Sequence, residues 1–511
     1  MVPARERGNA ASAFRRPLAL AALTAMLLAG CAVGPDFTTP SLDAGAGYVK
    51  GGTPKGTTSA AIAGGEAQTF LAGADVPGRW WTMFGSAKLN ALVDAAMTDN
   101  PDVAAATASL TEAQENVLAA GGSLLPSVGA SADVSRQQTQ SSGFKNISNL
   151  FNASVSVSYA FDVFGGTRRS IEALAAQADV QRYQLEATYL ALTANVVTTA
   201  VQEASLREQI AATNEILKSQ QDALELLQQQ VELGAGARAD VLSQQSALAQ
   251  TRATLPPLEK SLAMQRNQLA VLTGRFPNNT PAATFRLSDL KLPRKLPVSL
   301  PSELVAQRPD VRAAEAQLHA ASAAVGVAIA NQLPQFTISA AGGGSSFRLE
   351  DFFNNGGVWS IAGGVTAPIF DGGSLFHRRK AAEAAYLAAA AQYRSVVLGA
   401  FQDVADAIRA LQSDADALRA ALAANDAAAS SLQLTREQFQ AGAVAYLSLL
   451  TAQQTYQETR LSLASAQAQR YADTVALYQA LGGGWWNRPS RAPEPNPNAP
   501  VLAVATDLGR N

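Results

Sequence analysis

Few residues of this 511-residue sequence have types and spacing that suit catalysis. Only two histidines occur, His319 and His377, and neither lies near a cysteine or at a spacing typical of metal ligands. Glycines cluster at 342–344 and 356–357, but no helix follows them where a phosphate-binding loop requires one. We therefore expect no enzyme, no metal site and no cofactor. The formal net charge of -2 provides no basic field for nucleic acid.

The single cysteine, Cys31, has a clear chemical interpretation. It ends the motif Leu28-Ala29-Gly30-Cys31, which follows four arginines and a largely apolar run, the pattern of a secretory signal. The motif resembles a bacterial lipobox, whose cysteine is thioether-linked to diacylglycerol and becomes the acylated first residue of the mature chain. We predict residues 1–30 as a lipoprotein signal peptide and Cys31 as the lipidation site. The alternative is an ordinary cleaved signal with an incidental cysteine.

The mature N-terminus indicates how the protein is attached to its membrane. Ala32, rather than an aspartate, occupies the second mature position, which the usual lipoprotein sorting rule associates with the outer membrane. Residues 31–79 are rich in small residues and proline, and we predict an extended, lipidated arm. No other segment has 18 consecutive apolar residues, so we expect no membrane-spanning helix.

Two long helices dominate the rest of the chain. The run 168–233 contains neither proline nor glycine, and as one helix it would extend roughly 100 Å. Ile210, Leu217 and Leu224 recur every seven residues, the period of a coiled coil. A similar run, 374–440, predicts a second rod. A coiled-coil scaffold would explain the rods alone, but the flanking segments are not helical.

Two segments before the rods alternate apolar and polar residues, as strands do. Val155, Val157 and Tyr159 alternate with serines in a hairpin predicted at about 127–163, and a second hairpin is predicted at about 335–370. Long strands of this kind suit a transmembrane barrel whose apolar face contacts lipid and whose polar face lines a lumen. A hairpin of a soluble sandwich is the alternative.

The order of elements repeats at an offset of 208 residues. Arg308-Pro309-Asp310-Val311 corresponds to Asn100-Pro101-Asp102-Val103, and the Gly-Ala turns after the two rods also correspond. We predict structural repeats at 80–274 and 302–484. The linking residues 275–301 contain five prolines, from which we expect an extended connector without a paired strand. We expect the tail, 485–511, to be disordered.

The number of strands predicts the assembly. Each chain supplies four membrane-type strands, fewer than the eight of the smallest barrels. Two chains would give a barrel filled by side chains, whereas three would give twelve strands and room for a lumen. We therefore infer an α+β membrane protein that is a homotrimer, with a β-barrel continued by a helical cylinder roughly 100 Å long in the periplasm.

Several motifs together resemble one family. The segment Cys31 to Phe37, the Trp80-Trp81 and Phe84-Gly85 region, both Pro-Asp-Val motifs and the Gly-Ala turns resemble the TolC-like outer-membrane factor family in its NodT-type lipoprotein branch. The resemblance implies a trimeric twelve-stranded barrel continued by a helical tunnel. It also implies a duct that contacts outer-membrane lipid, a periplasmic adaptor and an inner-membrane pump of the RND type, and that exports drugs, solvents or metal ions without any reaction of its own.

The resemblance also implies two functional places. The turns after the rods would be the tips that contact the adaptor, and they contain Gly234, Gly236, Ala237, Gly442 and Ala443.

Leu447 and Thr451, one helical turn apart, lie where the family has its periplasmic gate. Family members often carry a carboxylate near the Thr451 position, and its absence here favours a hydrophobic ring of Leu447. Ordinary coiled-coil packing is the alternative for both residues.

Two other functions remain open at this stage. The same architecture would serve as the outer-membrane duct of a type I protein secretion system, in which an exporter ATPase replaces the proton-driven pump. A non-channel periplasmic scaffold lipoprotein, in contrast, would conduct no ions.

Overall fold

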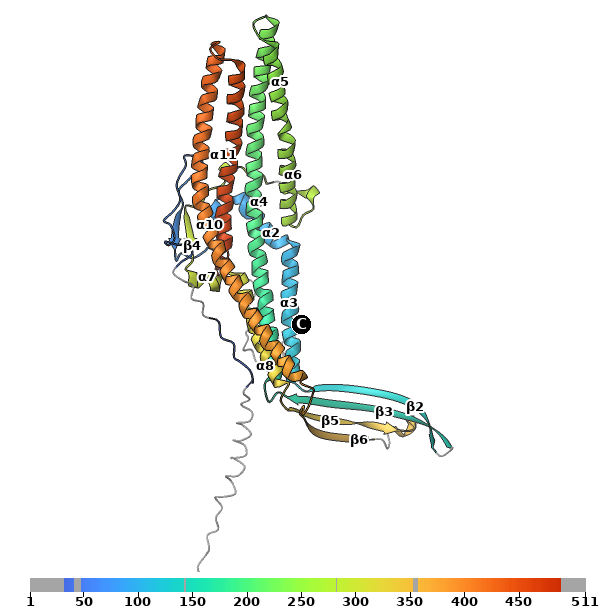
Figure 1. Cartoon of the computed structure of the whole chain (residues 1–511). Coiled ribbons are helices and arrows are strands. Elements are labelled where there is room, and N and C mark those ends of the chain that lie inside the picture. The colour runs from blue at the N-terminus through green and yellow to red at the C-terminus, as the bar shows by residue number, and fades with distance from the viewer. Residues whose placement is uncertain (1–31, 41–46, 142–143, 282, 353–356, 489–511) are drawn as a thin grey trace, which may run out of the picture.

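The computed structural model describes residues 32–40, 47–141, 144–281, 283–352 and 357–488 (Figure 1). The predicted signal peptide and Cys31 lie outside these described residues, as does the chain after residue 488. A long helical body carries a four-stranded sheet that projects from one end (Figure 1). Among the described helices, none is both long and apolar enough to cross a membrane.

Two helices of 67 residues each, α4 (Gly166–Glu232) and α10 (Ser374–Gln440), run the length of the body. Helix α4 turns back into α5 (Arg238–Ala253) and α6 (Leu255–Leu272), and α10 turns back into α11 (Tyr446–Ala480). The break between α5 and α6 coincides with Pro256 and Pro257, because proline cannot continue a hydrogen-bonded helix. The two helical hairpins lie side by side and reach away from the sheet (Figure 1).

Shorter helices thicken the body near the sheet. They are α2 (Ala87–Asp99), α3 (Pro101–Gly121), α7 (Pro301–Gln307) and α8 (Pro309–Ala330). The Asn100 side chain begins α3 by accepting a hydrogen bond of 2.8 Å from the Asp102 amide. The main core lies where these helices meet the rods. There Trp80 is fully buried and stacks on Tyr478 with 5.3 Å between ring centroids.

Both rods begin with the same local structure after a strand. Asp162 accepts hydrogen bonds from the Thr167 and Arg168 amides, and Asp371 accepts them from the Gly373 and Leu375 amides. The residue before each rod is a glycine with positive φ, 76° at Gly165 and 84° at Gly373. A residue with a side chain would be strained there, so glycine permits the sharp turn from strand to helix.

The projecting sheet joins the two repeats. It contains β2 (Ser127–Ser141), β3 (Phe144–Phe161), β5 (Gln335–Ser346) and β6 (Gly357–Thr366) in the order β2-β3-β5-β6, all antiparallel. The β3–β5 pair brings the two predicted hairpins together, a contact between residues almost 200 positions apart. Strands β2 and β6 are left as edges within the described chain.

The register separates the sheet into an apolar and a polar face. Val128 is opposite Val157, Val157 opposite Ala340, and Ala340 opposite Ile361. Since directly opposed residues point to the same side of a sheet, these four share one face. The other face carries mostly hydroxyl and small side chains: Ser131, Ser154, Ser156, Ser158, Thr337, Ser339, Ala341, Ser360 and Ala362.

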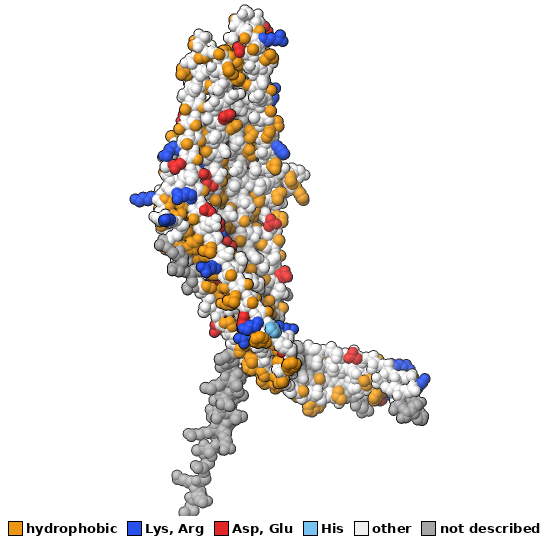
Figure 2. Space-filling view, viewed as in Figure 1, with side chains coloured by type: hydrophobic (Ala, Val, Ile, Leu, Met, Phe, Trp, Pro, Cys, Tyr) orange, Lys and Arg blue, Asp and Glu red, His pale blue; other side chains and the backbone are white. Residues whose placement is uncertain are grey.

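No residue of known exposure in these four strands is buried, and the Trp359 side chain is 80% exposed. The single chain therefore gives neither face of the sheet a core. Figure 2 also shows hydrophobic side chains gathered where the sheet joins the helical body.

The connector prediction is wrong in one respect. Residues 295–298 form β4 (Lys295–Val298), which pairs in parallel with β1 (Thr69–Ala72). Pro297 lies within β4 opposite Leu71, and such a position is tolerated because a two-stranded sheet has only edge strands. Leu296 is fully buried beside this pairing, so packing against the body holds the strand despite its proline.

The predicted limits of the arm and the tail also need correction. The described part of the arm before residue 79 is not merely a tether, because it supplies β1 and the buried Val76. Residues 485–488 are not disordered: Trp485 Nε1 donates to the Gln307 carbonyl at 2.6 Å, and Asn487 donates to Asp75 at 2.7 Å. These contacts link segments far apart in sequence, which local composition does not reveal.

Candidate functional site: tips and gate of the helical rods

The two turns after the rods lie together at the end of the body farthest from the sheet (Figure 1). They have the same geometry, because Gly234 and Gly442 both have φ of 73°. In each turn the next amide reaches back to a rod carbonyl: Ala235 donates to Gln230 and Ala443 donates to Gln438. This arrangement ends an α-helix with a glycine in the left-handed region. The five residues predicted to contact an adaptor therefore lie at the ends of the two helical hairpins, and contact with an adaptor stays a prediction.

The tips present backbone and small side chains to solvent. Gly234, Ala237, Gly442 and Ala443 are exposed, whereas Gly236 is half-buried against α4. At the first tip, these small residues are flanked by the exposed side chains of Leu233, which is 84% exposed, and Arg238.

Leu447 and Thr451 lie together on the exposed side of α11. The Leu447 side chain is 68% exposed, and the Thr451 hydroxyl donates to the Leu447 carbonyl at 2.9 Å. Both line a groove of about 460 Å³ between α10 and α11. Its other lining residues are small or carry hydroxyls: Ala428, Ser431, Thr435, Ser448, Ala452 and Thr455. Leu447 is thus the one large apolar side chain in a groove lined by uncharged residues.

The neighbours of Leu447 have the opposite environment. Tyr446, Leu449 and Leu450 are buried in a cluster with Leu227 and Ala247 of the other hairpin. Within this chain, these residues therefore provide the packing between the hairpins, and Leu447 does not.

Polar contacts near the tips also join the two helical hairpins, and sequence reasoning missed them. Arg436 donates to the Ser219 hydroxyl at 2.7 Å, and Arg460 forms an ion pair with Glu208 at 3.2 Å. The Tyr446 hydroxyl donates to Gln244, whose side chain is completely buried. Burial, and secondarily the charge of Asp240, raises the pKa of Tyr446 well above its usual value, so this hydroxyl stays protonated.

A polar residue on the buried face of a predicted coiled coil, such as Gln244, is the sequence signal that would have pointed to these contacts.

A cavity of about 200 Å³ lies beside these contacts, between α4, α10 and α11. Arg436, Arg460, Ile216 and Tyr456 are among the residues that line it. The two hairpins are therefore not closely packed against each other at this level.

The family model described as outer membrane efflux protein matches this chain twice, at residues 92–275 and 300–483. The two matches coincide with the internal repeat.

Curated relatives and solved structures agree with this match. The chain is 32% identical to the pyoverdine export outer membrane protein OpmQ of Pseudomonas putida over 416 residues, which are 80% of this chain and 88% of the relative. It is 28% identical to nodulation protein T of Rhizobium leguminosarum bv. viciae over 469 residues, 91% of this chain and 93% of the relative. The structure resembles the outer-membrane channel OprN with a TM-score of 0.79 and 26% identity, over 89% of this chain and 100% of that one.

The fold is accordingly that of TolC-like outer-membrane channels, with a helical domain for the periplasm. The twofold match, the extent of the alignments and the shared architecture together show that this chain belongs to the outer membrane efflux protein family.

Proposed function

We propose that three copies of this chain form a passive duct through the outer membrane, which exports small molecules delivered by a periplasmic adaptor and an inner-membrane pump of the RND type. The observation that carries the proposal is the four-stranded sheet, with its two open edges, one apolar face and one polar face. Such a sheet cannot be stable in isolation, because it buries no core on either side.

The two open edges are suited to closure with further copies. Strand order and antiparallel pairing make β2 and β6 run in opposite directions. Hence β6 of one copy can pair with β2 of the next while the alternation of directions continues around a ring. Closure removes unpaired edges from the membrane interior, where unsatisfied backbone groups are costly. Three copies give a twelve-stranded barrel that is wide enough for a lumen.

The height of the apolar face matches a bilayer. On β3 the apolar positions extend from Phe151 to Phe161, a stretch of roughly 35 Å along the strand. With the usual barrel tilt of about 45°, this corresponds to a band about 25 Å tall, the value typical of outer-membrane barrels. Beyond this band, the same face carries Arg136 and Asn149, which are opposite each other. This polar pair marks one end of the band; further along the same face, the apolar Ile147 is opposite Gln138, and Lys145 is opposite Gln140.

The polar face supports a lumen with little selection by charge. Among the paired positions described on this face, Asp133 is the single ionisable residue, and most of the others are serine, threonine, glycine or alanine. A neutral, hydroxyl-rich wall admits varied small solutes. The relative OpmQ is named for export of pyoverdine, which supports a small-molecule cargo. Supply by an adaptor would use the tips at Gly234 to Ala237 and at Gly442 and Ala443.

The narrowest point of the duct is assigned to Leu447, with Thr451 one turn deeper. Threefold repetition would bring three copies of this exposed apolar side chain around one axis, and a hydrophobic constriction gates by excluding water.

The experiment that tests the duct combines mass and conductance. Detergent-extracted protein should have three times the mass of the mature chain by light scattering corrected for bound detergent, and it should form ion-conducting pores in planar bilayers. A monomer or dimer would overturn the twelve-strand closure. A trimer without conductance, even after the Leu447→Ala change, would support a scaffold instead.

A further inference from the structure

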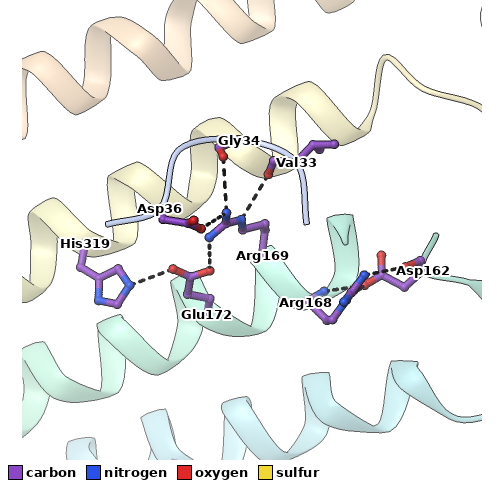
Figure 3. A network of polar contacts seen from close by, with 8 residues as sticks. All are labelled: Val33, Gly34, Asp36, Asp162, Arg168, Arg169, Glu172 and His319. Carbon is purple, nitrogen blue, oxygen red and sulfur yellow. Dashed lines mark hydrogen bonds and ion pairs between the residues drawn. The ribbon is translucent and has the colours of Figure 1, made fainter. Parts of the chain in front are cut away.

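Arg169, in the first turn of α4, is a buried arginine whose partners come mainly from the N-terminal segment (Figure 3). Its side chain is only 5% exposed. It donates to the Val33 carbonyl at 3.2 Å and to Asp36 Oδ1 at 2.6 Å, and it makes a longer contact of 3.5 Å with the Gly34 carbonyl. The fourth acceptor, Glu172, lies on α4 at 2.8 Å. A buried guanidinium needs such acceptors to offset the loss of water.

The same segment makes further contacts on both sides of Arg169. The Val33 amide donates to the Phe164 carbonyl at 3.0 Å. The Phe37 ring stacks on His319 of α8, with 4.4 Å between centroids and an interplanar angle of 11°. His319 Nε2 lies 2.9 Å from Glu172 Oε1, so the residue that supports Arg169 also holds the ring that receives Phe37.

Glycines on both sides allow the segment to approach α8 closely. A Cβ atom on Gly326 of α8 would lie 2.9 Å from the Val33 carbonyl oxygen and 2.9 Å from Arg169 Cγ. Gly34 has φ of 99°, and a Cβ there would lie 2.5 Å from Gly326 Cα. Neither position has room for a side chain, so the fit is specific to this glycine pair.

We propose that Arg169, Glu172, His319 and Gly326 form an intramolecular docking site for Val33–Phe37, a segment that begins two residues after Cys31, the predicted lipidation site. The ligand is a short peptide of this chain. The docking site recognises four groups of this peptide: the Asp36 carboxylate, the Phe37 ring and the backbone carbonyls of Val33 and Gly34. This segment belongs to the motif Cys31 to Phe37, which resembles that of the family, and docking gives the motif a structural role.

Docking also determines where the lipid anchor begins. Ala32 lies against Gly165, where a Cβ atom would be 2.6 Å from Ala32 Cα, and Gly165 is the turn between β3 and α4. The chain therefore leaves the docking site, towards the predicted lipidation site Cys31, at the level where the sheet meets the rods. If the sheet is the barrel wall, as proposed above, the acyl chains on Cys31 enter the membrane beside that wall. The docking itself does not depend on the duct function.

The test is hydrogen–deuterium exchange of the full-length lipidated protein, followed by mass spectrometry of peptides covering residues 32–40. Arg169→Gln replaces the charged, long guanidinium by a shorter, neutral amide that cannot reach the same set of acceptors. Gly326→Ala keeps every charge and raises helix propensity, but it occupies the space of the Val33 carbonyl. Both changes should accelerate exchange of the Val33 amide at least about tenfold. Gly399→Ala in α10, where a Cβ atom meets nothing within 4 Å, is the matched control and should change nothing.

Exchange in α8 and α4 peptides reports whether each variant is folded. If Arg169→Gln disturbs α4, the Gly326→Ala variant alone tests whether the docking site exists. Wild-type protein without protection at residues 33–37 would overturn the docking site, as would full protection in a folded Gly326→Ala variant. Neither result depends on trimer mass or conductance, so failure of the docking site and failure of the duct are distinguishable.

Discussion

Leu447 is a residue whose exposure is difficult to explain within one chain. An apolar side chain that is 68% exposed, next to neighbours that are buried, is typical of a contact that another copy completes. We expect Leu447→Ala to raise single-channel conductance severalfold, because three shorter side chains widen and wet the constriction. Planar-bilayer recordings measure this directly.

Leu242→Ala is the control for that substitution. Leu242 is 56% exposed, but it lies outside the groove that Leu447 lines, so Leu242→Ala should leave conductance unchanged. Equal conductance of Leu447→Ala and wild type would contradict a gate at Leu447 and favour the alternative, ordinary coiled-coil packing.

Asp473 on α11 gives the protein a pH dependence that can be measured. Burial, together with hydrogen bonding and repulsion from Asp414 on α10, raises the pKa of Asp473 from 3.8 to about 7. Because the folded pKa is the higher one, the stabilising contribution of the protonated acid is complete below about pH 4. It is lost as pH rises towards 7.

Asp473→Asn keeps an uncharged side chain at every pH, and its oxygen can still accept from Gln469 as Asp473 does. We expect it to stabilise the protein by at least about 1 kcal/mol at pH 8, with no gain at pH 4. Thermal unfolding followed by tryptophan fluorescence at both pH values measures the effect. Asp426→Asn, at an exposed position of α10, should give no gain at either pH, and an equal gain from the two variants would contradict the assignment.

At the scale of elements, Tyr446 joins the two helical hairpins. Its hydroxyl satisfies the buried Gln244 side chain, and its ring packs in the cluster with Leu227 and Ala247. Tyr446→Phe keeps the ring but leaves a buried acceptor without its donor, which costs about 1–3 kcal/mol.

We therefore expect Tyr446→Phe to loosen the tips without unfolding the body. Amides of 227–250 and 440–455 should exchange faster, while those around Trp80 keep their rate. Tyr456→Phe, a half-buried change on the same helix, serves as the comparison. Uniformly faster exchange throughout the chain would indicate general destabilisation instead.

Elements were predictable from sequence where their signal is periodic. The rods have a heptad row and no helix breaker, and each hairpin alternates every second residue, so both patterns are visible within a short window. The proximity of Leu447 and Thr451 on one side of α11 follows from their spacing of one helical turn. The exposure of Leu447 does not follow, because its neighbours Tyr446, Leu449 and Leu450 are also large and largely apolar, and packing against α4, α5 and α10 decides which of them are buried.

Long-range contacts of segments without a period could not be predicted. The β1–β4 pair joins a proline-containing strand to a segment over 200 residues away, and Arg169 gives no sign in the sequence that its acceptors lie in Val33–Asp36. Such contacts depend on which surfaces the folded body brings together. The composition of these segments favours disorder or an extended conformation without contacts. In the folded protein, packing against the helical body stabilises them instead.

At the scale of the whole molecule, two attachments to the membrane should be separable. Cys31→Ala should abolish fatty-acid labelling, because the thioether requires the thiol. It should reduce assembly only partly, because the barrel still holds the protein in the bilayer. Metabolic labelling and the yield of trimer in outer-membrane fractions measure the two effects, and unchanged labelling would contradict the lipidation site.

The sheet without a core has a consequence for biogenesis. Before its edges meet those of other copies, a newly exported chain would present unpaired strand edges and a broad apolar face to water, the combination that promotes aggregation. The helical body has its own buried core and can fold first from contacts within each hairpin. If the proposed trimer is correct, the strands must then remain unformed or shielded until three bodies are in register, and the rate at which channels appear should depend steeply on the concentration of exported chains.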